Sequence, residues 1–258
     1  KMQIPYYLPV NKEVEVFEHC YRSRLPVMLK GPTGSGKSRF VEFMAHKLGK
    51  NLITVACHEE TSATDLIGRF LLKGAETVWV DGPLTKAVKE GSIIYLDEIA
   101  EARPDIIVAI HPLTDHRRQL YMDKLGTTVA AHPDFLLVIS FNPGYQKGFK
   151  ELKPSTKQRF VGLAFNYPKE KTEVEILLNE TKIDEKTAGS LVKIASKIRN
   201  LTELGLAETV STRLLVDAAH LIAADLPKRT AVEAAILQPL TDEEETLAAL
   251  RDLANLYI

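Results

Sequence analysis

Residues 31–38 combine three glycines, a lysine and two serines at a spacing that can bind phosphate groups. The segment is Gly31, Pro32, Thr33, Gly34, Ser35, Gly36, Lys37 and Ser38, which matches GxxxxGK[ST] at each fixed position. Glycines let backbone N–H groups converge on phosphate oxygens, and a helix that starts here adds partial positive charge. We expect Lys37 to reach the β- and γ-phosphates and Ser38 to hold Mg²⁺.

Two adjacent carboxylates, Asp97 and Glu98, follow the apolar segment 93–96. A strand at the centre of a parallel sheet delivers its carboxyl end to the phosphate site. We therefore expect Asp97 to bind Mg²⁺ through water and Glu98 to polarise the attacking water, a role typically worth about 10²–10⁴ in rate. A helix cap is the alternative for this pair, but the phosphate loop in the same chain favours the role in nucleotide hydrolysis.

Three further polar residues could complete such a site. Asn142 follows the apolar segment 136–140 and could orient the same water, although Asn-Pro-Gly is also an ordinary turn. Arg159 could reach the γ-phosphate of a neighbouring subunit, a contact worth about 10³–10⁵ in rate. Arg213, at a predicted helix start, could contact the γ-phosphate from a second domain. Spacing alone leaves both arginines open to the simpler interpretation of solvated surface residues.

Short apolar segments alternate with helical patterns over residues 1–168. Strands are predicted at 27–29, 52–55, 93–96 and 136–140, and helices at 11–23 and 37–48. This alternation predicts an α/β domain with a parallel sheet covered on both faces. The phosphate loop then lies between the first strand and the second helix.

The pattern changes after Pro168, where strong strand segments end. We predict a small all-α lid domain of four or five helices over residues 169–258. Helix starts are predicted at three capping boxes and one serine: Thr172 with Glu175, Thr230 with Glu233, Thr241 with Glu244, and Ser211.

Composition excludes several protein classes. The 258 residues carry 33 Lys and Arg against 34 Asp and Glu, a net charge of −1, which argues against nucleic-acid binding through bulk charge. The apolar runs are too short to span a bilayer. Cys20 and Cys57 form no CxxC pair or zinc spacing, so we expect a reducing, cytoplasmic location.

The order of these motifs resembles that of the AAA+ ATPases, specifically the MoxR branch and its CbbQ/NirQ/NorQ group. The phosphate loop and the acidic pair carry part of this resemblance. Further segments that carry it are 64–70, 113–133 with Arg117, Arg118 and Gln119, 139–144, and 153–155 through 159–160. The resemblance covers nearly the whole chain and looks closest to CbbQ-type proteins. It implies that Asn142 is sensor 1, Arg159 an arginine finger acting in trans and Arg213 sensor 2.

The resemblance also implies partners. It suggests a homohexameric ring in which residues 71–80 form a hairpin facing the central pore; whether Trp79 there is a core or a contact residue stays open. It suggests a CbbO-like adaptor with a von Willebrand factor A domain, and inhibited Rubisco as the client to be reactivated. NorQ/NirQ-type maturation of nitric oxide reductase is the alternative client function.

Other nucleotide-dependent functions fit less well. Residues 181–184 resemble the TKxD guanine-binding motif of GTPases, but they follow a predicted helix instead of a strand. A small-molecule kinase needs neither a neighbour's arginine nor a pore hairpin. A nucleotide-gated scaffold without significant hydrolysis is not expected to keep both Glu98 and Arg159. A DNA-remodelling motor is weakened by the neutral charge.

Overall fold

The computed structural model describes residues 5–143, 151–201, 206 and 208–258. The chain divides into two compact units, which are described separately below. The first comprises Lys1–Gly31 and Lys37–Phe165, and the second comprises Pro32–Gly36 and Asn166–Ile258. The domain boundary between residues 168 and 169 stays a prediction, close to this change of unit.

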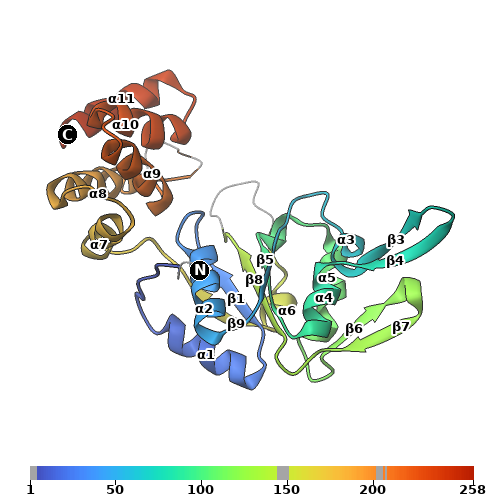
Figure 1. The fold of residues 1–258 in the computed structure, drawn as a ribbon. Helices are drawn as coiled ribbons and strands as arrows, with labels where there is room; N and C mark the ends of the chain where they lie inside the picture. Colours follow the sequence, from blue (N-terminus) through green and yellow to red (C-terminus); the bar gives the residue numbers. More distant parts are fainter. Residues whose placement is uncertain (1–4, 144–150, 202–205, 207) are drawn as a thin grey trace. The chain divides into compact units, whose positions relative to one another are not determined.

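A five-stranded parallel sheet with the order β2-β5-β8-β1-β9 forms the centre of the first unit (Figure 1). The strands are β1 (Val27–Lys30), β2 (Leu52–Ala56), β5 (Ile93–Asp97), β8 (Leu136–Phe141) and β9 (Val161–Ala164). The predicted α/β class and the first four strands are confirmed. Strand β9 was not predicted from the sequence, because its four residues include a glycine and carry no strong apolar pattern.

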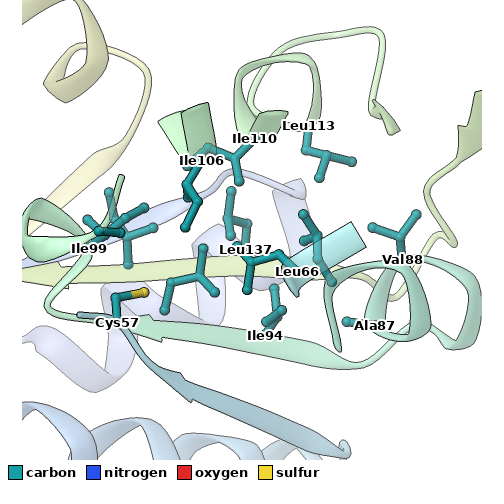
Figure 2. Packing of buried hydrophobic residues seen from close by; sticks show 14 of the residues in the cluster. Cys57, Leu66, Ala87, Val88, Ile94, Ile99, Ile106, Ile110, Leu113 and Leu137 are labelled. Atoms are coloured by element: carbon teal, nitrogen blue, oxygen red, sulfur yellow. The ribbon is translucent and has the colours of Figure 1, made fainter. Parts of the chain in front are cut away.

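The sheet is covered on both faces because its central strands are mostly apolar, with buried side chains on both sides. The helices of this unit are α1 (Glu13–Ser23), α2 (Lys37–Leu48), α3 (Ala63–Ile67), α4 (Pro83–Glu90), α5 (Pro104–Ile110) and α6 (Pro154–Lys157). Alternate side chains point to opposite faces: Ile93 and Tyr95 join a core with α1 and α2, whereas Ile94 joins the core beneath α3, α4 and α5. Figure 2 shows this second core, where Ile94 and Leu137 of neighbouring strands lie together.

Two antiparallel hairpins extend beyond α3, α4 and α5 (Figure 1). One pairs β3 (Gly68–Lys73) with β4 (Glu76–Asp81), which confirms the hairpin predicted over residues 71–80. Its exposed apolar side chains include Leu72, with 79% of its surface accessible. The other pairs β6 (Gln119–Met122) with β7 (Thr127–Ala130) and lies within the predicted segment 113–133.

The second unit is helical, as predicted. Its α-helices are α7 (Glu170–Glu180), α8 (Glu185–Arg199), α9 (Thr212–Ala223), α10 (Lys228–Val232) and α11 (Glu244–Asn255), and they share one apolar core. In the part of the chain that the structure describes, no helix combines the length and apolar character needed to cross a membrane.

The predicted helix starts were right at one position in four. Ser211 caps α9 by accepting a hydrogen bond from the Leu214 N–H. The three threonine capping boxes were wrong, because α7, α10 and α11 follow Lys169, Pro227 and Glu243 instead, and these residues cap no backbone group through their side chains. Asp184, within the TKxD-like segment, is the N-cap of α8, so that segment follows a helix as expected.

A buried ion pair joins helices of the second unit. The Arg199 guanidinium donates two hydrogen bonds of 2.8 Å to Glu173, which has no accessible surface. The Glu173 carboxylate also accepts from the Thr212 hydroxyl at 2.6 Å, and Arg199 donates to the Val210 carbonyl at 2.7 Å. These partners of the buried charge all come from the same unit, which makes the pair tolerable without water.

We predict that Arg199→Leu destabilises the protein by about 3–5 kcal/mol, because it leaves the Glu173 charge buried without its cation. The double variant Glu173→Leu/Arg199→Leu should lose less, since no charge remains buried. Denaturant unfolding followed by circular dichroism measures both. Arg22→Leu, which removes an exposed ion pair with Glu18, is the matched control and should unfold like the unaltered protein. Equal losses for Arg199→Leu and Arg22→Leu would contradict a structural role for the buried pair.

Candidate nucleotide-binding site

The phosphate loop connects β1 to α2, as the motif requires. β1 ends at Lys30 and α2 begins at Lys37. Gly34 and Gly36 have φ angles of +69° and +91°, which side chains with a Cβ rarely adopt. Gly31 is required for another reason, because a Cβ there would clash with the carbonyl oxygen of Phe165, the residue that follows β9. The glycines thus allow a backbone path that residues with a Cβ would strain or obstruct.

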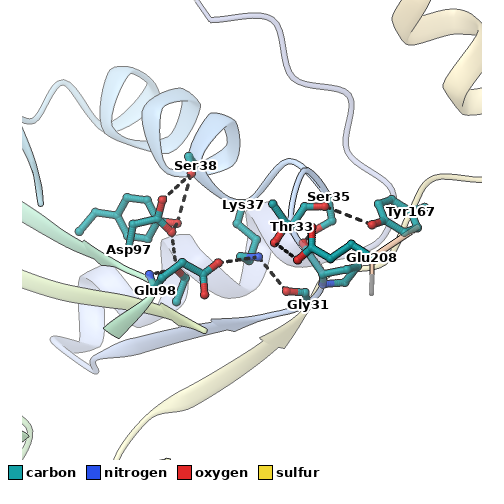
Figure 3. Close-up of polar contacts among 12 residues, drawn as sticks. Gly31, Thr33, Ser35, Lys37, Ser38, Asp97, Glu98, Tyr167 and Glu208 are labelled. Carbon is teal, nitrogen blue, oxygen red and sulfur yellow. Dashed lines mark hydrogen bonds and ion pairs between the residues drawn. The ribbon is translucent and has the colours of Figure 1, made fainter. Parts of the chain in front are cut away.

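Lys37 is a buried cation at the start of α2. Only 5% of its side chain is accessible, and its ammonium donates to the Gly31 carbonyl at 2.7 Å (Figure 3). The same nitrogen lies 3.7 Å from Oε1 of Glu98. A buried ammonium needs anionic partners, and a phosphate held in the loop would add to the one that Glu98 provides.

Asp97 is held by hydrogen bonds in a fixed orientation. Its Oδ1 accepts from the Tyr95 hydroxyl at 2.6 Å and from the Ser140 hydroxyl at 2.5 Å. Its other oxygen, Oδ2, lies 3.4 Å from the Ser38 hydroxyl (Figure 3). Asp97 and Ser38, the two predicted metal-binding residues, therefore face each other at the phosphate loop.

The Ser38 and Asp97 donors fit Mg²⁺. Both are hard oxygen ligands, and Mg²⁺ typically takes one or two protein ligands while it keeps waters and substrate phosphates. Over residues 5–143, 151–201, 206 and 208–258, no cluster of three or more His, Cys, Asp or Glu side chains is placed to hold a metal ion. A dedicated protein cage, as for structural zinc, is therefore not found in this part of the chain.

Glu98 has an unusual backbone conformation for a residue with a side chain. Its φ of 53° and ψ of 47° are left-handed, a conformation that costs about 1–3 kcal/mol when surrounding contacts must impose it. Its N–H donates to the Ser140 hydroxyl at 3.0 Å. Burial raises the pKa of its carboxyl above the usual value, whereas Lys37 and the backbone N–H of Asn142 act in the opposite direction. The structure thus brings Glu98, Lys37 and Asn142 together.

The predicted sensor and arginine residues lie at different places. Asn142 directly follows β8, next to Glu98; Gly144 of the same predicted segment lies outside the described residues. Arg159 follows α6, and its side chain, 37% accessible, lies 3.7 Å from Asp115. Arg213 is exposed in the first turn of α9. Within the second unit, a Cβ on Gly34 would lie 3.6 Å from the Cβ of Arg213.

Tyr95 and Ser140, the two residues that hold Asp97, were not predicted from the sequence. Both lie in the apolar segments 93–96 and 136–140 that predict strands β5 and β8. The available signal was a polar group inside each segment: Ser140 is the one hydroxyl in the six residues of β8, and Tyr95 lies two positions before Asp97 on the same strand face. A hydroxyl buried in a central strand requires a partner, and here the partner is the carboxylate.

Two protein families match separate parts of the chain, one before and one after the predicted domain boundary. Residues 26–160 match the AAA domain (dynein-related subfamily), and residues 173–257 match the CbbQ/NirQ/NorQ C-terminal family. The first match contains the phosphate loop, the acidic pair and Asn142, and the second contains Arg213.

Relatives match along almost the whole chain. Protein NorQ of Paracoccus denitrificans (strain Pd 1222) is 55% identical over 97% of this chain and 93% of its own length. Protein CbbQ of Hydrogenophilus thermoluteolus is 55% identical over 97% and 94%, respectively. The denitrification regulatory protein NirQ of Pseudomonas aeruginosa is 50% identical over 98% of both chains.

Solved structures show the same fold at low sequence identity. A mutant of Thermotoga maritima RuvB superimposes with a TM-score of 0.55 and 15% identity over 95% of this chain and 69% of that one. A putative ATPase from Cytophaga hutchinsonii gives a TM-score of 0.52 and 17% identity over 96% of this chain and 90% of that one. At this identity the likeness concerns the fold alone.

Proposed function

Because the chain belongs to the CbbQ/NirQ/NorQ group of MoxR-type AAA+ ATPases, we propose that it uses ATP hydrolysis to remodel a client protein. The observation that carries the hydrolytic part is the meeting of Lys37, Asp97 and Glu98 at one edge of the sheet, with the Lys37 ammonium 3.7 Å from the Glu98 carboxylate. The Lys37 cation, which can bind the phosphates, thus lies next to Glu98, which can accept a proton from water.

Each residue at this edge receives one role in the proposal. The amides of residues 31–38 and the Lys37 ammonium bind the β- and γ-phosphates. Ser38 and Asp97 hold Mg²⁺, which offsets the phosphate charge when it is bound. Glu98 accepts the proton of the attacking water, and Asn142 orients that water. The two contacts that oppose the burial of Glu98, from Lys37 and Asn142, favour its ionised, basic form.

Arg159 and Arg213 complete the site in the proposal. Arg159 is partly accessible and pairs with Asp115. In the proposal its guanidinium leaves Asp115 and contacts the γ-phosphate of the ATP bound to a neighbouring subunit. Such head-to-tail contacts close into rings, and we propose a homohexamer. Arg213, exposed at the start of α9, is proposed to contact the γ-phosphate as sensor 2. The exposed β3–β4 hairpin is proposed to face the pore of that ring.

The client is proposed from the relatives. A CbbQ protein matches 97% of this chain, and we propose inhibited Rubisco as the client, with a CbbO-like adaptor that carries a von Willebrand factor A domain. The equal identity of the chain to a NorQ and a CbbQ protein supports nitric oxide reductase maturation as the second candidate. In both cases ATP binding and hydrolysis shift subunits as rigid bodies and thereby move the adaptor and client.

We expect Glu98→Gln to bind ATP normally but to hydrolyse it at least about 10²-fold more slowly, because the amide cannot accept a proton from water. Phosphate release measures hydrolysis, and fluorescence of a labelled ATP analogue measures binding. Glu90→Gln, which alters an exposed carboxylate at the end of α4, is the matched control and should retain full activity. Unchanged turnover in Glu98→Gln would remove this residue from the mechanism.

We expect inactive Arg159→Ala and Lys37→Ala subunits to regain part of their ATPase activity when they are mixed. An interface in a mixed ring can combine the intact Lys37 of one subunit with the intact Arg159 of its neighbour. The measurement is phosphate release as a function of mixing ratio, with each variant alone as control. Mixtures that stay inactive at all ratios, or a dilute monomer as active as the assembled form, would rule out the proposed trans contact.

The client assignment predicts that the protein, ATP and the adaptor reactivate Rubisco blocked by a tight-binding sugar phosphate. Carbon dioxide fixation by the treated Rubisco measures recovery. Recovery should disappear with Glu98→Gln and without the adaptor, because both the motor and the link to the client are needed. If the same pair instead restores assembly of active nitric oxide reductase, the client assignment is replaced and the ATPase proposal stands.

A further inference from the structure

Ser140 places a single hydroxyl between the two acidic residues of the site. It has no accessible surface and lies in β8, whose other residues are all apolar. Its register position follows the pair Leu96 and Ile139, so it lies level with the end of β5. The hydroxyl donates to Oδ1 of Asp97 at 2.5 Å and accepts from the N–H of Glu98 at 3.0 Å. This buried group therefore acts as donor to one functional residue and as acceptor from the next.

The bond to Asp97 determines which carboxylate oxygen faces the phosphate loop. Oδ1 is occupied by Ser140 and by the Tyr95 hydroxyl, which holds it at 2.6 Å. Two donors on one oxygen restrict rotation of the carboxylate and leave Oδ2 directed at Ser38, 3.4 Å away. The oxygen available to a cation at the loop is thus the one that Ser140 and Tyr95 do not use.

The bond to Glu98 supports its left-handed backbone. With a φ of 53°, Glu98 has a conformation that residues with a Cβ adopt only when their surroundings impose it. The Ser140 hydroxyl accepts the N–H that this conformation turns toward β8. The same conformation brings the Glu98 carboxylate toward the Lys37 ammonium and the backbone N–H of Asn142. Loss of the hydroxyl removes one contact that keeps the carboxylate there.

We propose that Ser140 is a positioning residue that orients the Mg²⁺-binding oxygen of Asp97 and fixes the backbone of Glu98 through the two hydrogen bonds of one hydroxyl. The inference rests on the proposed ATPase function. It separates the roles of the two hydroxyls at the site: Tyr95 contacts Asp97 and, at 3.4 Å, Ser38, whereas Ser140 bonds to both acidic residues.

The test compares Ser140→Ala, Ser140→Thr and Tyr95→Phe with the unaltered full chain. Steady-state phosphate release gives kcat, the KM for ATP and the Mg²⁺ concentration for half-maximal rate. Titration of a fluorescent ATP analogue, with Mg²⁺ and with EDTA, gives nucleotide affinity without reference to catalysis. Thermal unfolding reports whether each variant is folded at the assay temperature.

Ser140→Ala should lower kcat by about 10- to 100-fold, as expected for loss of hydrogen bonds to charged or catalytic groups. Its Mg²⁺ requirement should rise by about tenfold, the size typical for residues that orient a metal ligand. Affinity in EDTA should not change. Tyr95→Phe should raise the Mg²⁺ requirement with a much smaller effect on kcat, because Glu98 keeps its partner. Ser140→Thr keeps the hydroxyl and should restore most of both properties.

If Ser140 had a purely structural role, the results would differ. Ser140→Ala would then lower the unfolding temperature while kcat and the Mg²⁺ requirement of the folded protein stayed unchanged, and the proposal would be overturned. If Ser140→Ala does not fold, Ser140→Cys, which keeps the side-chain shape with a weaker donor, must show the same two losses. If the unaltered chain binds but does not hydrolyse ATP, the proposed function fails, and the effect of Mg²⁺ on nucleotide affinity in Ser140→Ala still decides the role of Ser140.

Discussion

Parallel pairing of β1, β8 and β5 is the constraint on which the site depends. The pairing sets Lys30 level with Phe141 and Leu96 level with Ile139. All three strands therefore end at the same edge of the sheet, and the chain leaves each of them through a polar segment. The phosphate loop, the acidic pair and Asn142 lie far apart in the sequence, and this register brings them to one edge.

The charged groups at this edge are buried, as for Lys37, or partly buried, as for Asp97 and Glu98, which explains why so many hydrogen bonds converge there. Lys37 is 5% accessible and lies between the Gly31 carbonyl and the Glu98 carboxylate. Asp97 accepts from Tyr95 and Ser140, and the Lys37 ammonium and the Asn142 backbone N–H oppose the rise in the pKa of Glu98 that burial causes. An unpaired charge would be costly at such positions, so each ionic group is held by partners that also fix its direction. The site is thereby organised by the protein's own contacts.

In the second unit, buried charges are also held by partners, but there they form a structural ion pair. Glu173 and Arg199 are buried together, and their partners Thr212 and Val210 belong to the same helical unit. The pair needs no bound metal ion or phosphate as a further partner, so we regard it as structural. The contrast shows how partners distinguish a buried charge that stabilises a unit from one that is arranged to receive a ligand.

The sequence by itself determined the fold class, the family and the residues of the phosphate and acidic motifs, because these depend on local spacing and on apolar segments that are long enough to recognise. It did not determine β9, which is short and contains Gly162, nor three helix starts, which follow Lys169, Pro227 and Glu243 instead of the predicted threonines. Only the tertiary structure decided that Ser140 holds Asp97 and the Glu98 backbone, because these contacts join two strands across separations of 43 and 42 residues. It also decided that Tyr95 turns its hydroxyl to Asp97 and that Glu98 is left-handed. Hydrophobic patterning records which residues are buried, whereas the partner of a buried polar group is set by strand register and backbone angle.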